Sequence, residues 1–351
     1  MDKIRAAFVR ESGGVEIREV ERPTMEAGGI MVRMEASGVC GTDLEKLVGK
    51  NISSNILGHE VSGIVTESLS DKFKVGERVV PHHHVQCGKC NVCKVGAYTM
   101  CPVFKASHFV PGGFADEFMV PPHNVANGGV HLIKSDISFN EASFAEPLGC
   151  CIRGLSRAIE KERNRKDPQF PLKALVVGAG PIGLLHMELL RSYSKEVRIC
   201  SADISKKRLE FSEKFEDAVP LEVPKSDGRF SEKALKEESD GFDLVIVATG
   251  IVEALTEAIK CVRKSGKLLL FGVPHKGSMF TMDLPGFFQN ELTMTTSYAT
   301  TESEISEALR LLSSRKIDVD KFITATFPLE RISEGMSEAR SEDQVKVIIT
   351  K

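Results

Sequence analysis

Apolar and polar positions follow different patterns in the two parts of the chain. Up to about Phe144, short apolar runs such as 63–66 and 78–80 lie between closely spaced glycines and prolines. This pattern is typical of β-strands joined by turns. At 145–159 the apolar positions take helical spacing, and a charged link with several chain breakers follows at 160–171. The change indicates that a β-rich part ends near this point.

Strands and helices then alternate along the chain. Strands are predicted at 173–177, 197–201, 242–248 and 267–271, with helices at 184–193, up to 209, and at 254–262. This alternation predicts a doubly wound parallel sheet with helices on both faces, so the fold class is α/β. The tail has an amphipathic helix at 302–313 and a strand at 345–350.

Length and charge limit the possible functions. The 351 residues suggest two domains at roughly 150 residues each. Lys and Arg number 46 and Asp and Glu 49, so the net charge of −3 argues against the basic surface that nucleic acid requires. The most apolar window, 174–190, contains His186 and Glu188, and we therefore expect no membrane span.

The nine cysteines are the most informative part of the composition. The N-terminal segment lacks the features of a secretory signal, so we expect a cytoplasmic protein. In a reducing compartment, clustered cysteines hold a metal more often than they form disulfides. Cys150, Cys151, Cys200 and Cys261 lie in apolar runs, and we expect them to be core thiols.

Four cysteines form one dense cluster. Cys87, Cys90, Cys93 and Cys101 have the spacing C-x2-C-x2-C-x7-C, with Gly88 and Gly96 to turn the chain. Four thiolates at this density fit a closed tetrahedral zinc site, which leaves no position for a substrate and is therefore structural. Disulfides or free thiols are the alternative.

A glycine-rich motif indicates a dinucleotide site. Gly178, Gly180, Pro181, Ile182 and Gly183 belong to a G-x-G-x-x-G sequence that follows a predicted strand and opens a predicted helix. Glycines at these positions let the backbone approach a pyrophosphate at the helix N-terminus. A tight turn without a ligand is the alternative.

The acid expected after this motif is also present. Asp203 lies 20 residues after Gly183, where a carboxylate would bind both ribose hydroxyls and repel a 2′-phosphate. We therefore expect NAD rather than NADP. Arg208 is a candidate lid on the adenine, whereas Lys206 and Lys207 are interpreted as a solvated face.

Later strand ends complete this predicted site. Ligands of open α/β sheets bind beyond the carboxyl ends of the strands. The candidates there, which could also be ordinary strand ends, are Ala248, Thr249, Phe271, Gly272 and Val273.

A second set of metal-binding residue types is dispersed. Cys40, His59 with Glu60, and Glu146 could offer one thiolate, one imidazole and one carboxylate, leaving the open fourth position of a catalytic zinc. Spacing alone leaves ordinary packing residues equally possible. The three histidines at 82–84 cannot all face one ion on an extended chain, so we interpret them as structural or cleft-lining.

The order of these motifs resembles the zinc-containing medium-chain dehydrogenase/reductase family along essentially the whole chain. Glu146-Pro147 resembles the sorbitol, threonine and glucose dehydrogenase branch. The resemblance implies a GroES-like catalytic domain at 1–151 with the zinc lobe at about 82–104, a Rossmann domain at 152–297, and a return to the catalytic domain at 298–351. It includes the segment 112–115 and places Ser297 among the cofactor-binding residues.

By this resemblance, Cys40, His59 and Glu146 are zinc ligands. Glu60 is an exchanging ligand or an acceptor behind the ligands, and Thr42 takes the substrate proton. The family commonly has a histidine five residues after the cysteine ligand, whereas this chain has Glu45. Either Glu45 ends the proton relay or the proton leaves through water. The change favours sugars and polyols over threonine.

The expected activity is hydride transfer from a polyol, sugar or secondary alcohol to NAD, with two zinc ions per chain. L-threonine 3-dehydrogenase and glucose 1-dehydrogenase are the alternatives within the family. A non-catalytic protein that binds NAD and zinc is the alternative of another class. The expected partner is a small polyhydroxy substrate, with no nucleic acid and no membrane. A homo-oligomer, tetrameric or dimeric, is implied by the resemblance.

Overall fold

The computed structural model describes residues 2–49, 57–159 and 172–351. The backbone divides into two compact units, one of residues 1–149 and 299–351 and the other of residues 150–298. The expected link at 160–171 lies outside the described residues. No helix in the described part of the chain has the length and apolar character that crossing a membrane requires.

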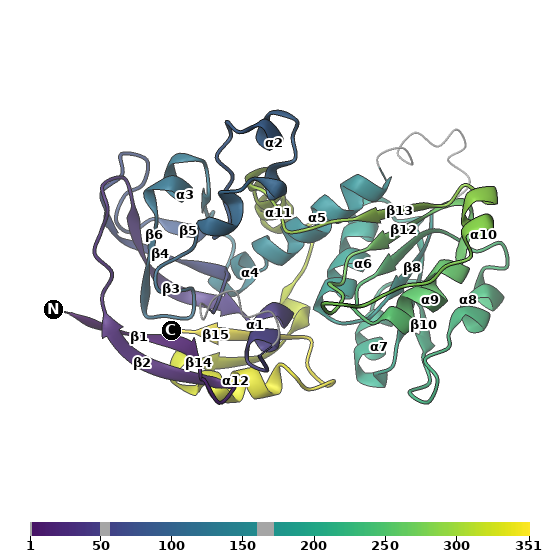
Figure 1. Cartoon of the computed structure of the whole chain (residues 1–351). Coiled ribbons are helices and arrows are strands. Elements are labelled where there is room, and N and C mark those ends of the chain that lie inside the picture. The colour runs from purple at the N-terminus through teal and green to yellow at the C-terminus, as the bar shows by residue number, and fades with distance from the viewer. Residues whose placement is uncertain (1, 50–56, 160–171) are drawn as a thin grey trace. The chain divides into compact units, whose positions relative to one another are not determined.

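The first unit is built on a seven-stranded sheet with the order β14-β15-β3-β4-β5-β7, and β6 pairs with β3 (Figure 1). Its strands are β3 (Ile30–Gly38), β4 (Glu60–Ser68), β5 (Arg78–Pro81), β6 (Glu117–Val120), β7 (Val130–Leu132), β14 (Ile323–Pro328) and β15 (Lys346–Thr350). A separate antiparallel pair is formed by β1 (Lys3–Val9) and β2 (Val15–Glu21). The tail thus supplies two strands to the sheet of the β-rich part.

Short helices fill the connections of this unit. They are α1 (Gly41–Lys46), α2 (Asn91–Lys94), α3 (Pro122–Ala126), α4 (Phe139–Ser143), α11 (Glu302–Ser313) and α12 (Ile332–Glu338). The apolar core lies on the sheet and includes Ile30, Val65, Phe114 and Phe118. By contrast, the small core of the cysteine lobe consists of Cys93, Cys101 and Phe104, with only half-buried residues packed against it. The lobe therefore has little apolar material to hold it together.

The second unit contains a six-stranded sheet with the order β10-β9-β8-β11-β12-β13, and every pairing is parallel. Its strands are β8 (Lys173–Val177), β9 (Arg198–Asp203), β10 (Val219–Glu222), β11 (Phe242–Val247), β12 (Val262–Leu270) and β13 (Thr293–Thr296). Numbered along the chain, the order is 3-2-1-4-5-6, which is that of a Rossmann fold. The predicted fold class is confirmed.

The helices of the second unit lie along this sheet (Figure 1). They are α6 (Pro181–Tyr193), α7 (Lys206–Ser212), α8 (Ser231–Glu237), α9 (Val252–Lys260) and α10 (Leu284–Gln289), while α5 (Ala145–Ile159) begins in the first unit. The predicted helix at 254–262 extends too far. It ends at Lys260, and Val262 opens β12, which reaches 267–270 through an irregular step at Ser265, where φ is +58°.

Candidate functional site

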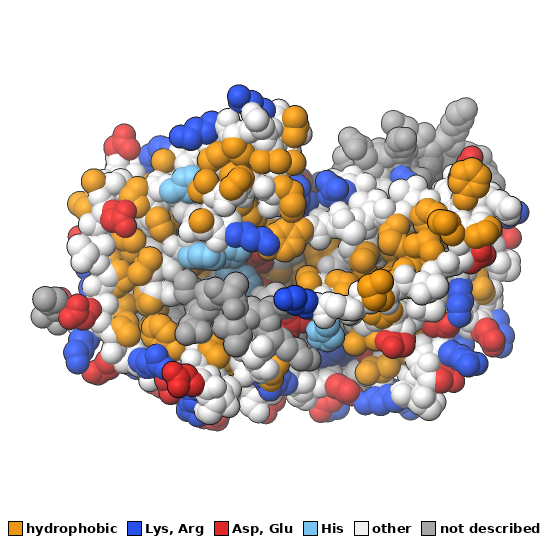
Figure 2. Space-filling view, viewed as in Figure 1, with side chains coloured by type: hydrophobic (Ala, Val, Ile, Leu, Met, Phe, Trp, Pro, Cys, Tyr) orange, Lys and Arg blue, Asp and Glu red, His pale blue; other side chains and the backbone are white. Residues whose placement is uncertain are grey.

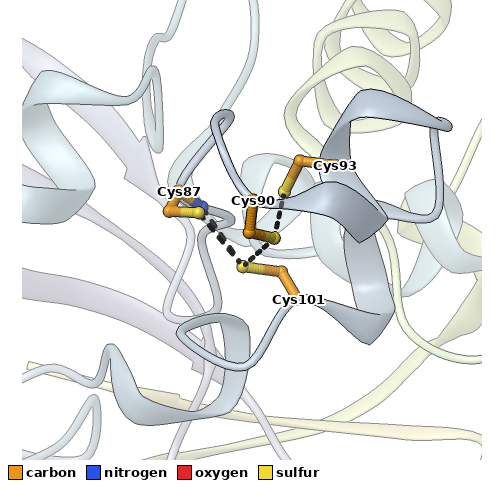
Figure 3. A group of neighbouring side chains, drawn as sticks. All are labelled: Cys87, Cys90, Cys93 and Cys101. Carbon is orange, nitrogen blue, oxygen red and sulfur yellow. Dashed lines mark hydrogen bonds between the residues drawn. The ribbon is translucent and has the colours of Figure 1, made fainter.

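The four predicted lobe cysteines lie together (Figure 3). The Sγ–Sγ distances are 3.5 Å for Cys90–Cys93, 3.8 Å for Cys90–Cys101 and 3.6 Å for Cys87–Cys101. Ligands about 2.3 Å from a tetrahedral zinc are about 3.8 Å apart, whereas a disulfide brings its sulfurs to about 2.05 Å. The geometry fits a closed zinc site and excludes disulfides among these thiols.

The environments of the lobe thiols differ. Backbone N–H groups of Lys89 and Cys90 lower the pKa of the Cys87 thiol to about 6. Burial raises the pKa of Cys93 to about 12. A cation at the centre would favour the thiolate of both, because metal ligands must be deprotonated.

Cys40, His59 and Glu60, here called the Cys40 cluster, offer ligand atoms within 4.8 Å of one another. The sheet brings them together, since β3 and β4 pair antiparallel with Gly38 opposite Glu60. Cys40 lies just beyond the end of β3, and His59 lies just before β4. A Cβ at Gly38 would lie 2.2 Å from Glu60 Oε2, so glycine leaves room for the Glu60 carboxylate in its present position.

A buried aspartate supports this cluster. Asp43 is fully buried in α1, and its Oδ1 lies 3.6 Å from His59 Nδ1. Its carboxylate also accepts hydrogen bonds from the N–H groups of Cys40 and Gly58. Such a carboxylate behind an imidazole fixes which ring nitrogen faces a metal. Sequence reasoning missed Asp43, although its place three residues after Cys40 was a usable signal.

The charges of this cluster favour a cation. Burial disfavours the protonated ring, but the carboxylate of Asp43 and the sulfur of Cys40 outweigh burial and raise the pKa of His59 well above its usual value. The same two groups would attract a metal ion.

Glu60 has a second partner that sequence reasoning also missed. Its carboxylate forms a buried ion pair with Lys346 of β15, whose Nζ also donates to the carbonyl of Val39 at 3.0 Å. Because β15 pairs with β3 next to β4, the tail delivers this lysine to the site. In this arrangement Glu60 is held as an acceptor for Lys346 at the edge of the cluster.

Glu146, the third zinc ligand implied by the family resemblance, lies beside two histidines. At the start of α5 it groups with His82 and His83, and the ligand atoms of these three residues, here called the His82 cluster, lie within 4.8 Å of one another. The two clusters touch, since the rings of His59 and His83 have centroids 5.0 Å apart. His84 does not belong to this group, and residues 82–84 follow the end of β5 at Pro81.

The two candidate relay residues lie on one short helix. Thr42 is exposed and Glu45 is half-buried, both in α1 directly after Cys40. A hydroxyl and a carboxylate therefore follow Cys40 within five residues of the sequence.

The glycine motif forms the expected turn between β8 and α6. Gly183 packs so tightly that a Cβ there would lie 1.8 Å from the carbonyl oxygen of Gly178, so only glycine allows α6 to begin here. Pro181 is the first residue of α6, Ile182 follows it, and Gly180 caps the helix without a side-chain hydrogen bond. The first N–H groups of the helix are thus not occupied by a cap, which suits a phosphate.

Asp203 and Arg208 flank this turn. Asp203 ends β9, and its carboxylate accepts from the N–H of Ala179 at 2.6 Å and of Ser205 at 2.8 Å. Arg208 in α7 has Nη1 4.0 Å from the position of a Cβ on Gly180. Both predicted side chains therefore lie at the glycine-rich turn.

The later strand ends lie where the sheet order reverses. Ala248 follows β11 beside β8, and its N–H donates to Val177. A Cβ on Gly272 would lie 2.2 Å from the Thr249 carbonyl carbon, and one on Gly250 would lie 2.2 Å from Val273 O, so the two loops pack closely.

Phe271 and Ser297 differ in what they offer. The ring of Phe271 packs edge-on against His186, 4.7 Å between centroids, and so faces a helix of its own unit. Ser297 follows β13, and its Oγ is buried without a hydrogen-bond partner. An unpaired hydroxyl of this kind suits a bound ligand.

Three of the four cysteines expected to be core thiols are buried. Cys151, Cys200 and Cys261 are buried, whereas Cys150 is half-buried.

Two protein-family profiles match the chain. The alcohol dehydrogenase GroES-like domain matches residues 26–129, and the zinc-binding dehydrogenase profile matches residues 181–314. D-altritol 5-dehydrogenase of Agrobacterium fabrum is 32% identical over 330 residues, 92% of this chain and 92% of that protein. D-arabitol-phosphate dehydrogenase of Enterococcus avium is 27% identical over 328 residues, 91% of this chain and 89% of that protein.

The fold agrees with these matches. The crystal structure of a zinc-binding dehydrogenase target from Sinorhizobium meliloti 1021 bound to NADP has a TM-score of 0.85 at 22% identity and covers 100% of both chains. The chain therefore belongs to the zinc-containing medium-chain dehydrogenase/reductase family and is an oxidoreductase. The family resemblance seen in the sequence is confirmed.

Proposed function

We propose that the protein oxidises a secondary hydroxyl group of a polyol or sugar by transferring hydride to NAD. The observation that carries the proposal is the Cys40 cluster, in which a thiol, an imidazole and a carboxylate converge in the GroES-like unit of a chain whose other unit has a dinucleotide-binding turn.

The donor set of the Cys40 cluster fits zinc. Cys40 and His59 are the proposed ligands, with Glu146 as the third ligand that the family resemblance implies. Glu60, which pairs with Lys346, is either a ligand that exchanges with water or an acceptor behind the ligands. Zinc, when bound, would act as a Lewis acid that makes the substrate hydroxyl more acidic. Asp43 orients His59, and Thr42 and Glu45 are the proposed acceptors of the released proton.

The second unit is the proposed NAD site. The turn from Gly178 to Gly183 would hold the pyrophosphate, and Asp203 would bind the ribose hydroxyls. The carboxylate of Asp203 now accepts two backbone N–H groups, and its negative charge opposes a 2′-phosphate. The NADP of the Sinorhizobium structure belongs to a protein 22% identical and does not transfer to this chain.

Polyols are the proposed substrates because relatives named for altritol and arabitol phosphate align with about nine-tenths of the chain. Threonine and glucose are the competing substrates within the family. A non-catalytic binding protein is disfavoured because the chain has all three residues of the proposed catalytic zinc site, Cys40, His59 and Glu146.

A homo-oligomer is proposed on an exposed apolar surface of the second unit. Met279 is 86% exposed, Phe288 81% and Leu284 66%. Hydrophobic side chains gather on this part of the molecule near α10 and β13 (Figure 2). Because β13 is the last strand of its sheet in the described part of the chain, its outer edge could pair with the same edge of a second copy.

The thiols of the lobe suit a reducing compartment such as the cytoplasm.

The function is tested by NAD reduction with sorbitol, xylitol, arabitol, altritol, glucose, threonine and 2,3-butanediol. Activity with at least one polyol, lost on chelation and restored by zinc, is expected. A preference for threonine or glucose would show that the substrate is not a polyol and would assign the protein to that substrate instead. A zinc-loaded protein that binds NAD and oxidises none of these compounds would contradict the proposal.

A further inference from the structure

The His82 cluster has the donors of a metal site in its own right. His82, His83 and Glu146 bring two imidazole nitrogens and one carboxylate oxygen within 4.8 Å of one another, inside the first unit. His82 is 1% exposed and Glu146 9%, so these polar groups are shielded from water. Buried imidazole nitrogens require hydrogen bonds or a cation to compensate them.

The far side of the His82 ring is fixed by a carboxylate. Nδ1 of His82 lies 3.1 Å from Oε1 of Glu302, the first residue of α11. A carboxylate accepts, so Nδ1 carries the hydrogen and Nε2 of the neutral ring keeps its lone pair. That Nε2 atom is buried and has no hydrogen-bond partner. Metal-binding histidines have this arrangement: one ring nitrogen donates to a carboxylate, and the other ring nitrogen is left to bind the metal.

His83 shows the same deficit. Its Nδ1 is also buried without a hydrogen-bond partner. The backbone that carries both rings is held by Asn124, whose Nδ2 donates to the carbonyl of His82 at 2.8 Å and of His83 at 3.3 Å. The two orphaned nitrogens therefore belong to a supported segment, and one ring nitrogen of each histidine lies within 4.8 Å of a carboxylate oxygen of Glu146.

We propose that His82, His83 and Glu146 bind a second divalent transition-metal ion next to the Cys40 cluster, with zinc as the ion of first choice. Two imidazoles and one carboxylate suit zinc and leave a position for water or a substrate oxygen. Glu146 has two carboxylate oxygens, so it can serve this ion and the proposed zinc of Cys40 and His59 together. The contact between the His59 and His83 rings joins the two sites.

This site goes beyond the proposed function, which requires one zinc at Cys40 and one in the lobe. The proposal predicts three ions per chain. The full-length protein is saturated with Zn²⁺, desalted, and its zinc is counted by mass spectrometry. We expect three zinc ions for the wild type and two for His82→Ala.

His84→Ala is the matched control, because His84 lies in the same segment and touches His83 but does not belong to the ligand group. It should keep three ions. If His82→Ala does not fold, as judged by its thermal transition, His83→Asn provides the same loss of one ligand. Replacing zinc by Co²⁺ gives a second measurement. Co²⁺ in the His82 cluster should add ligand-field absorption bands without thiolate charge-transfer bands, and His82→Ala should remove these added bands.

Two zinc ions in the wild type and in His82→Ala would overturn the proposal. So would an unchanged count of three in both His82→Ala and His83→Asn. A raised KM for the polyol with an unchanged count would likewise overturn it and assign the histidines to substrate contact. Polyol turnover with two ions would leave the proposed function intact, whereas three ions without turnover would refute that function alone.

Discussion

The four-cysteine lobe and the Cys40 cluster are two candidate metal sites built in opposite ways. All four lobe ligands come from residues 87–101, and they are four of one kind. The Cys40 cluster draws a thiol, an imidazole and a carboxylate from the ends of β3 and β4, and a buried lysine from β15 adjoins it. A local site can close around its metal and stiffen a small lobe, whereas a site assembled by a sheet can leave a position open for chemistry.

Cys40→Ser should have the largest effect. Loss of the Cys40 zinc removes several kcal/mol of charge stabilisation, so turnover should fall by about 10³-fold or more. NAD binding and the lobe zinc should persist. Steady-state kinetics, NADH fluorescence titration and zinc counting measure these three quantities. Cys150→Ser, which removes a half-buried thiol outside both clusters, is the control. Full activity in Cys40→Ser would remove Cys40 from the mechanism.

Cys101→Ser should affect stability more than chemistry. The lobe has almost no apolar core, so a zinc ion bound by the four cysteines would supply much of its stability. At free zinc 1,000 times the Kd, losing that site costs about 4 kcal/mol of unfolding free energy. Thermal and denaturant unfolding with and without zinc measure the loss. If Cys101→Ser lost turnover as completely as Cys40→Ser and stayed as stable as the wild type, the contrast between the sites would be reversed.

Lys346→Met probes the tail's contribution to the Cys40 cluster. Both partners of the Lys346–Glu60 pair are almost fully buried. Removing one leaves the other as a buried charge without its partner, which should lower the free energy of unfolding by about 3 kcal/mol. Denaturant unfolding of the zinc-free protein measures this cost. The double variant Lys346→Met with Glu60→Gln should recover most of it. Lys3→Met, which breaks an exposed pair with Glu19, should change stability by less than about 1 kcal/mol. Equal effects of Lys346→Met and Lys3→Met would contradict the buried pair.

Asp43→Asn should give the smallest effect, because the ligands themselves stay. Loss of the carboxylate behind His59 should weaken zinc binding at the Cys40 cluster by about 10- to 100-fold. Chelator competition measures this affinity, and the lobe zinc in the same sample is the internal control. Equal weakening at both sites would show a general loss of structure instead.

Sequence periodicity predicted several elements correctly because their patterns are local. The helices 145–159 and 302–313 and the strand 173–177 have the predicted bounds. The error at 254–262 arose because apolar residues continue from α9 into β12 and no breaker separates them. The helix ends at Lys260 with Cys261 as its C-cap, and composition gives no sign of this end.

The candidate sites were predictable in proportion to how local they are. The C-x2-C-x2-C-x7-C spacing and the glycine turn were complete in the sequence. Asp43 was within reach because it lies three residues from Cys40. Lys346 and Glu302 were not, because they come from the tail, more than 200 residues from the groups they contact.

The sequence by itself determined the family, the grouping of the four lobe cysteines and the glycine-rich turn, since short-range spacing and chain order specify these features. Tertiary structure alone decided which carboxylate lies with which histidine. Antiparallel pairing of β3 with β4 brings Glu60 to Cys40 and His59, and the start of α5 brings Glu146 to His82 and His83. The physical reason is that sheet register and helix placement, which are cooperative properties of the whole unit, set distances between residues that have no fixed spacing along the chain.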